Sequence, residues 1–140
     1  MAVHVLAVLA YREGDPVTSA RLAASVNTNP VIIRRLLLSL QKARLVETRK
    51  GAGAGSRLSR SPGRINLGEV YRAVEDVEPF ATPARKANTA CPVGHCIRET
   101  LKMVFASAES ALERDLQKTT LAGVVTMIKA ACPAVVKKTS

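Results

Sequence analysis

Two helical segments joined by a three-residue turn constrain the fold of this chain most strongly. Residues 19–26 read SARLAASV and residues 30–43 begin PVIIRRLLLSL, and both segments place apolar side chains at helical spacing. The letters NTN separate them. Asn29 followed by Pro30 is a strong helix start, because asparagine accepts hydrogen bonds from free backbone amides and proline suits the first helical position. The pattern predicts a helix-turn-helix whose second helix buries Val31 or Ile32 together with Ile33, Leu36, Leu37 and Leu40.

The segment after the second helix predicts a β-hairpin. Residues 46–49 and 56–59 have strand character, and the letters GAGAG between them suit a flexible tip. GAGAG is not a phosphate-binding loop, because the Gly-Lys-Ser/Thr ending of such loops is absent. A helix-turn-helix followed by a basic hairpin is a winged helix.

Helices on both sides complete an N-terminal domain. An apolar helix is expected over residues 2–13, where it buries Val5, Leu6 and Leu9, and another begins at Asn66 after the hairpin. The first of these is interpreted as a helix and not as a targeting segment, because it lacks a charged start and a convincing processing site. We therefore expect a winged helix-turn-helix domain over residues 1–77.

The C-terminal part predicts a long helix that pairs with a second copy. Residues 78–91 contain two prolines and read as a linker, and Pro92 then begins a helix that ends near Lys118. Its apolar stripe is too long for a chain of this size to cover, so residues 92–135 are expected to form dimerisation helices, the last of them capped by Thr119 or Thr120. The expected fold is mostly α with a small β-hairpin wing and a long C-terminal dimerisation helix.

Positive charge is concentrated in the first half of the chain. Residues 1–65 hold 11 basic and 3 acidic side chains, a net charge of +8, whereas residues 66–140 hold 10 and 8, a net charge of +2. This imbalance favours a polyanionic partner, and double-stranded DNA is the polyanion that suits a winged helix. Arg34 and Arg35 face outward early in the second helix, where arginine can bind guanine, although adjacent arginines can also serve only to solvate a helix. The hairpin region adds cations suited to phosphates or the minor groove: Arg49, Lys50, Arg57 and Arg60.

The chain resembles the Rrf2 family of bacterial winged-helix regulators. The shared features are a helix-turn-helix ending in LV, a glycine-rich wing, the segment INLGEVYRAVE and a long helix after it, over about Ala2 to Val125. The resemblance implies a cytoplasmic, homodimeric, sequence-specific DNA-binding repressor that recognises an imperfect palindrome. It also implies base-reading positions at Val31, Ile32, Arg34 and Arg35 and a wing-tip position at Lys50. Ser19 and Asn29, at the two helix starts, are expected as further DNA contacts.

The three cysteines allow a metal or cluster site, a thiol switch or inert structural side chains, and the metal or cluster site is the least favoured of these. Their odd number favours a reducing compartment. Family members that bind an iron-sulfur cluster use three closely spaced cysteines, whereas CPVGHC supplies Cys91 and Cys96 and the next thiol is Cys132. We therefore expect no metal or cofactor, as in the cluster-less subgroup that SVNTNP and CPVG resemble. Cys91 and Cys96 lie at the start of the long helix, where the helix dipole lowers a thiol pKa, so they are either redox sensors or inert structural side chains.

Two other functions are weighed against a specific regulator. A non-specific or RNA-binding winged helix is disfavoured because the chain has four aromatic residues, none of them in the hairpin where a base would stack. A thiol-based redox enzyme is disfavoured because neither cysteine has an evident base and orienting carboxylate. No apolar run approaches the ~20 residues of a membrane span, so no membrane partner is expected.

Overall fold

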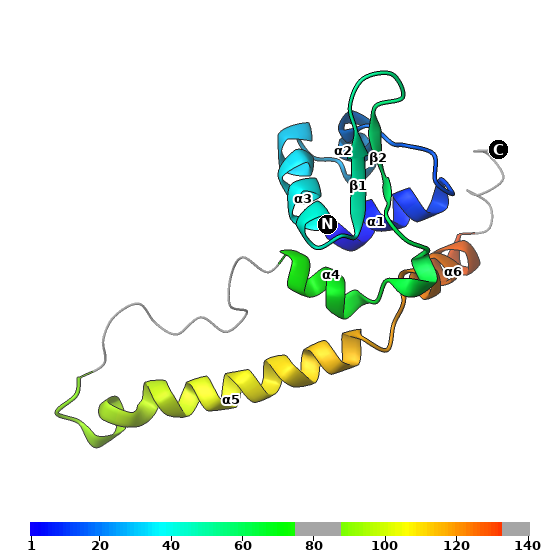
Figure 1. Cartoon of the computed structure of the whole chain (residues 1–140). Helices are drawn as coiled ribbons and strands as arrows, with labels where there is room; N and C mark the ends of the chain where they lie inside the picture. The colour runs from blue at the N-terminus through cyan, green and yellow to red at the C-terminus, as the bar shows by residue number, and fades with distance from the viewer. Residues whose placement is uncertain (75–87, 133–140) are drawn as a thin grey trace.

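The expected mostly α fold with a two-stranded hairpin is confirmed. The computed structural model describes residues 1–74 and 88–132, and a helical N-terminal body carries the hairpin while one long helix extends from it (Figure 1). The elements in chain order are α1 (Ala2–Tyr11), α2 (Ser19–Val26), α3 (Pro30–Lys42), β1 (Val46–Arg49), β2 (Gly55–Leu58), the short 3-10 helix η1 (Pro62–Arg64), α4 (Leu67–Val74), α5 (Pro92–Leu116) and α6 (Leu121–Ala131).

The helix-turn-helix begins and ends where side-chain caps satisfy the backbone. Oγ1 of Thr18 accepts from the amide of Arg21 at 3.3 Å and caps α2, and Oδ1 of Asn29 accepts from the amide of Val31 at 2.8 Å and caps α3. Asn27 ends α2 in the left-handed conformation with φ 57°, which asparagine tolerates better than most residues. The three residues NTN therefore suffice to turn the chain between the two helices.

The core lies between α1, the helix-turn-helix and the segments that follow the wing. The largest fully buried apolar side chains are Val5, Leu6 and Leu9 of α1, Leu22 of α2, Ile33 and Leu40 of α3, and Leu45, Ile65, Val70 and Leu121. The prediction that α3 buries Val31 or Ile32 is wrong, because both are exposed. Ile33, Leu37 and Leu40 set the buried phase of the helix, and residues 31 and 32 fall on the other side.

The wing is an antiparallel hairpin held against the body by a third segment. Val46 pairs with Leu58 and Arg49 with Gly55, so the second strand begins one residue earlier than predicted. Val17 and Ser56 exchange backbone hydrogen bonds of 2.9 and 2.8 Å, which adds a short bridge on the far side of β2. A Cβ atom at residue 55 would lie 2.9 Å from backbone atoms of Pro16 and Val17, so only glycine allows this approach.

The C-terminal end of α5 is fixed to the N-terminal body. The amide of Leu67 donates to the carbonyl of Thr119 at 2.9 Å, and the amide of Leu121 donates to the carbonyl of Ile65 at 2.8 Å. Gly68 permits α4 to cross α5 closely, because a Cβ there would lie 2.7 Å from Cγ of Gln117. Here α5 ends at Leu116, two residues before the predicted Lys118.

The last helix packs on the N-terminal body. Oγ1 of Thr120 accepts from the amide of Gly123 at 3.1 Å and caps α6, as the sequence predicts for one of two threonines. This helix contacts α1 and η1, and Leu121 is fully buried. Most of the predicted linker, residues 78–87, lies outside the described residues.

Candidate nucleic-acid interface

The outer face of α3 combines two arginines with exposed apolar side chains. Arg34 and Arg35 are exposed, and beside them Val31 is 48% exposed and Ile32 46%. Leu38, which the sequence analysis did not single out, is 58% exposed. Its spacing of four from Arg34 places it on the same face, and this spacing is the signal that could have identified it. The face offers both hydrogen-bond donors and apolar contact to a partner.

Four of the cations predicted to contact DNA are free of ion pairs in the described residues, two on α3 and two near the wing tip. Arg34, Arg35, Arg49 and Lys50 form no ion pair within the described parts of the chain. Arg49 ends β1 and Lys50 follows it in the tip, and both are exposed. The tip and the start of α3 lie at the same end of the body (Figure 1). Their charge is therefore available to one external polyanion.

Arg57 has a partner inside the wing. Its Nε donates to Oε1 of Glu47, directly opposite it in the hairpin register. The two side chains are partly exposed, so the pair is a surface ion pair whose stabilisation is small. Arg57 was predicted to contact DNA, and its charge is balanced in this structure.

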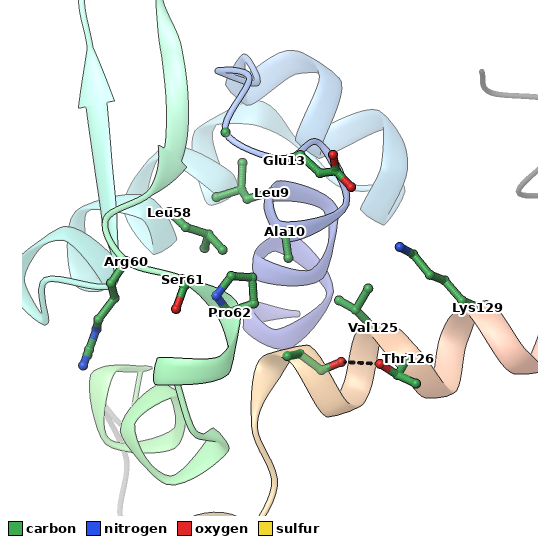
Figure 2. Close-up of a pocket in the computed structure, with 12 residues that line it drawn as sticks. Leu9, Ala10, Glu13, Leu58, Arg60, Ser61, Pro62, Val125, Thr126 and Lys129 are labelled. Carbon is green, nitrogen blue, oxygen red and sulfur yellow. Dashed lines mark hydrogen bonds between the residues drawn. The ribbon is translucent and has the colours of Figure 1, made fainter.

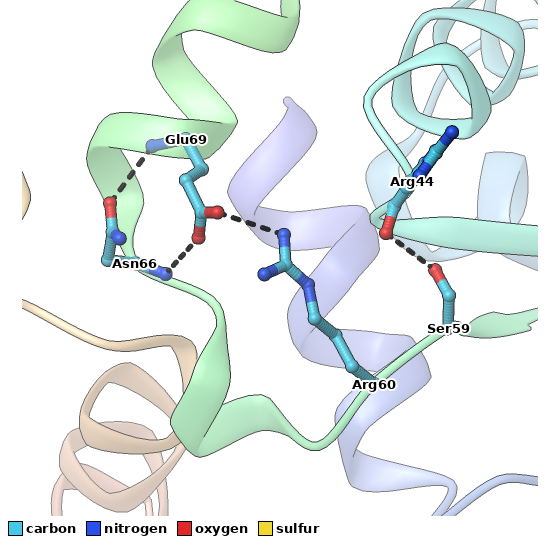
Figure 3. Close-up of polar contacts among 5 residues, drawn as sticks. All are labelled: Arg44, Ser59, Arg60, Asn66 and Glu69. Atoms are coloured by element: carbon cyan, nitrogen blue, oxygen red, sulfur yellow. Dashed lines mark hydrogen bonds and ion pairs between the residues drawn. The ribbon is translucent and has the colours of Figure 1, made fainter.

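Arg60 points away from the wing tip toward the start of α4. One of its terminal nitrogens donates to Oε1 of Glu69 at 2.9 Å, as Figure 3 shows. Glu69 also accepts from the amide of Asn66 at 3.1 Å, and Oδ1 of Asn66 accepts from the amide of Glu69 at 3.0 Å. These reciprocal bonds are a capping box. Arg60, predicted to contact DNA, thus contributes to the start of α4.

The same contacts set the charge of Glu69. Partial burial raises the pKa of Glu69, but the backbone amide of Asn66 and the guanidinium of Arg60 outweigh this effect, so the pKa of Glu69 lies below its usual value.

A further polar contact holds the chain after β2. Oγ of Ser59 donates to the carbonyl of Arg44 at 2.9 Å (Figure 3). The segment from Ser59 to Glu69 is therefore braced by polar contacts.

Ser19 and Asn29, the two remaining residues predicted to contact DNA, lie at helix starts. Ser19 is the first residue of α2 and is half-buried, with Thr18 in the capping position before it. Asn29 is exposed, but its side-chain oxygen is occupied by the amide of Val31. The structure thus brings Asn29 next to the outer face of α3 and gives it a capping role there.

The start of α5 shapes the surroundings of Cys91. Cys91 is the residue before the helix, and the backbone amides of Gly94 and then Val93 lower the pKa of its thiol, against a small opposing effect of burial. The carbonyl oxygen of Asn88 lies against Gly94, and a Cβ atom at residue 94 would be 2.1 Å from this oxygen. Cys91, Cys96 and Cys132 are all exposed free thiols.

Comparison with known proteins places the chain in a family. The sequence profile of the Rrf2 family, described as an iron-dependent transcriptional regulator, matches residues 1–127. The chain belongs to the Rrf2 family. Among its Rrf2 relatives, the HTH-type transcriptional regulator YwnA of Bacillus subtilis (strain 168) is 37% identical over 125 residues, covering 89% of this chain and 92% of YwnA. The HTH-type regulator NsrR of the same organism is 30% identical over 115 residues, covering 78% and 79%.

Solved structures agree with this assignment. A transcriptional regulator from Lactobacillus plantarum superposes with a TM-score of 0.74 at 25% identity, covering 98% of this chain and 93% of the other. IscR of T. potens gives a TM-score of 0.67 at 25% identity, covering 93% and 84%. The winged-helix architecture of the Rrf2 chain is therefore shared with solved regulators.

Two further features of this Rrf2 chain bear on its partners. The family description includes iron, yet within residues 1–74 and 88–132 no three His, Cys, Asp or Glu side chains lie close enough together to hold a metal ion. The described residues thus do not fit an iron site. In the same residues, no helix is long and apolar enough to cross a membrane.

Proposed function

We propose that this chain is a homodimeric, sequence-specific DNA-binding repressor of transcription that works in the cytoplasm. The observation that carries the proposal is the outer face of α3, where two guanidinium groups that form no ion pair in the described residues lie beside exposed Val31 and Ile32. Membership of the Rrf2 family and the names of the relatives support it, because YwnA and NsrR are both named HTH-type transcriptional regulators.

Base reading is assigned to the first two turns of α3. Arg34 and Arg35 each carry a fork of donors that matches O6 and N7 of guanine in the major groove, and a good bidentate pair contributes about 1–3 kcal/mol of discrimination. Val31 and Ile32 would contact thymine methyl groups, which lie in the same groove. The face therefore combines the two kinds of contact by which a helix distinguishes base pairs.

Backbone binding is assigned to the wing. Arg49 and Lys50 are exposed and unpaired in the described chain, so they can approach phosphates or the minor groove. Arg57 would first have to leave Glu47, and we expect a smaller contribution from it. Arg60 is proposed to stabilise the start of α4 through its hydrogen bond to Glu69, and it is not among the proposed DNA contacts.

Dimerisation is assigned to α5. None of its residues is buried in the single chain, and its 25 residues extend about 37 Å at 1.5 Å per residue. Ile97 is 36% exposed, Val104 56% and Leu112 40%, and they recur at helical spacing. A second α5 would cover this stripe. Two-fold symmetry then presents two copies of α3 to an imperfect palindrome.

A redox input at the start of α5 is part of the proposal. The lowered pKa of Cys91 increases the thiolate fraction, and the thiolate is the form that oxidants attack. Within the described residues, no histidine or carboxylate side chain hydrogen bonds to Cys91. This absence of a paired base disfavours the thiol-enzyme alternative.

Selection from random duplex DNA tests the proposal. The purified protein is mixed with a randomised pool, bound duplexes are recovered over several rounds, and their sequences are aligned. We expect an imperfect palindrome with guanine at the positions that face Arg34 and Arg35. Recovery of sequences without any shared pattern would instead support the non-specific winged-helix alternative.

A further inference from the structure

A cavity lies between the N-terminal body and part of the last helix, which packs on that body. It has a volume of about 530 Å³ and is bounded by α1, by the end of β2 with η1, and by α6 (Figure 2). Leu9, Leu58 and Val125 give it apolar walls, one from each of these three sides. Its volume lies within the range of roughly 300–1,000 Å³ that small-molecule sites occupy. The cavity is distinct from the proposed DNA-reading face on α3.

Two opposite charges stand on one side of this cavity. Glu13, just after α1, and Lys129 of α6 both line it and lie on the same side in Figure 2. Neither forms an ion pair within the described residues, and Nζ of Lys129 instead lies 5.4 Å from the ring centroid of Tyr11. Arg60 also lines the cavity, but its guanidinium is bound to Glu69. The available charges are therefore one carboxylate and one ammonium beside an apolar space.

We propose that this cavity binds a small zwitterion with an apolar body, of the class of apolar α-amino acids. The ligand carboxylate accepts hydrogen bonds from Lys129, and the ligand ammonium donates to Glu13. Its side chain lies against Leu9, Leu58 and Val125. Each polar contact joins ionised groups, which gives stronger hydrogen bonds than neutral partners do.

The position of the cavity makes its ligand an effector, and this step rests on the proposed DNA-binding function. An occupant contacts α1, which packs in the core of the reading domain, and α6, which follows α5 after four residues. Residues 65–67, just after η1, are hydrogen-bonded to residues 119–121, between α5 and α6. A ligand that favours one placement of α6 on α1 thus biases the angle between the reading head and α5. Because such coupling is reciprocal, the ligand changes DNA affinity and DNA changes ligand affinity.

Calorimetric titration of the full chain without DNA tests the binding site. The probes are L-leucine and L-phenylalanine, together with isocaproate, which is leucine without its ammonium group, and isoamylamine, which is leucine without its carboxylate. We expect at least one amino acid to bind, and each truncated probe to bind about tenfold or more weakly than L-leucine, because a charge-assisted hydrogen bond is lost. Binding of neither amino acid overturns the site, and equal binding of isocaproate overturns the zwitterion assignment.

Charge-removing variants locate the ligand. Lys129→Met and Glu13→Gln should each weaken the binding of the amino acid by about tenfold or more, for the same reason. Lys118→Met removes an identical charge outside the cavity, where Lys118 pairs with Asp115, and should leave ligand binding unchanged. Equal affinities in all three variants would place the ligand elsewhere and overturn the proposal. Melting curves of each variant check that the fold is retained.

DNA titrations with and without the bound amino acid test the effector role. We expect saturating ligand to change the Kd for the selected palindrome in the wild type and to have no effect in Lys129→Met. Without ligand, Lys129→Met should bind DNA as the wild type does, so failure of the cavity proposal and failure of DNA binding give different results. A bound ligand that leaves the Kd for DNA unchanged overturns the effector role.

Discussion

At the scale of single residues, the arginines of the first half of the chain have different surroundings. Arg34 and Arg35 extend from α3 with no ionic partner in the described residues, whereas Arg57 binds Glu47 and Arg60 binds Glu69. An arginine already paired within the protein must give up that contact before it can bind a phosphate. DNA contact is therefore expected from the unpaired arginines first.

Substitutions on α3 and on the wing should weaken DNA binding in different ways. Arg34→Ala or Arg35→Ala should cost about 1–3 kcal/mol on the selected site and relax the base preference there, because a contact to guanine is lost. Lys50→Ala should weaken all sequences alike and reduce the slope of log K against log salt by about 1. Fluorescence anisotropy with selected and shuffled duplexes at several salt concentrations measures both effects. Losses that are equal on both duplexes for every variant would contradict the assignment of Arg34 and Arg35.

Replacement of Glu69 should lower stability in a pH-dependent way. Glu69→Gln keeps a capping side chain but removes the ion pair with Arg60. Because the folded pKa of Glu69 is lowered, its charge stabilises the fold above the unfolded pKa of about 4.3, and this contribution is lost as the pH falls through the folded value. Melting temperatures should thus differ between the two proteins at neutral pH and converge in acid. A difference that stays constant down to acid pH would argue against this role of the charge.

The sequence alone predicts that Arg34 and Arg35 are exposed, but it does not predict the ion pairs of Arg57 and Arg60. The helix start at Asn29 and Pro30 fixes the phase of α3, so the exposure of Arg34 and Arg35 follows from the sequence. The pair of Arg57 with Glu47 depends on the hairpin register, which the repeated glycines leave open to a shift of one residue. The bond of Arg60 to Glu69 depends on the path of η1 between them, and no local pattern specifies that path.

At the scale of the elements, the existence of each helix is predictable from apolar spacing and caps. The residues at which the helices end are less predictable. The sequence predicts that the longest helix continues to Lys118, yet it ends at Leu116 because residues 119–121 pair with residues 65–67. That contact joins segments more than fifty residues apart, so no local pattern reveals it.

Two helical glycines should respond differently to alanine. Alanine favours a helix over glycine by up to about 1 kcal/mol. A Cβ at Gly123 meets only Oγ1 of Thr120 at 3.5 Å, so Gly123→Ala should stabilise the protein. A Cβ at Gly68 would lie 2.7 Å from Cγ of Gln117 and 3.3 Å from the carbonyl oxygen of Glu113, so Gly68→Ala should be the less stable variant. Urea unfolding of both variants measures this, and equal stabilisation would contradict the close packing of α4 on α5.

Cys91, at the start of α5, should be more reactive than the other two cysteines. All three thiols are exposed, so access alone does not separate them. The lowered pKa gives Cys91 a larger thiolate fraction at neutral pH, so it should react with iodoacetamide faster than Cys96 or Cys132. Timed alkylation followed by peptide mass spectrometry gives the three rates. Should Cys91 react no faster than the others, the redox input would have to enter elsewhere.

At the scale of the whole molecule, α5 carries an apolar stripe that the described part of the chain leaves exposed. Val104→Asp combined with Leu112→Asp should yield monomers in sedimentation experiments, because charged side chains would be buried between two helices. Ser110→Asp is the matched control, since Ser110 lies on the opposite side of the helix and is exposed. The double variant should still unfold cooperatively, because both positions are exposed in the monomer, but it should lose the stabilisation that association gives the wild type. A wild type that sediments as a monomer at micromolar concentration would contradict the dimer.

The ratio of two dissociation constants tests sequence-specific DNA reading by this chain most directly. The wild-type protein is titrated at one fixed salt concentration with the selected palindrome and with a shuffled duplex of the same composition. A specific regulator that reads bases through Arg34 and Arg35 should bind the palindrome about 10³-fold or more tightly, as specific binders do. A ratio near one would show that the positive charge of the N-terminal half binds DNA without reading its sequence, and would contradict the proposed function.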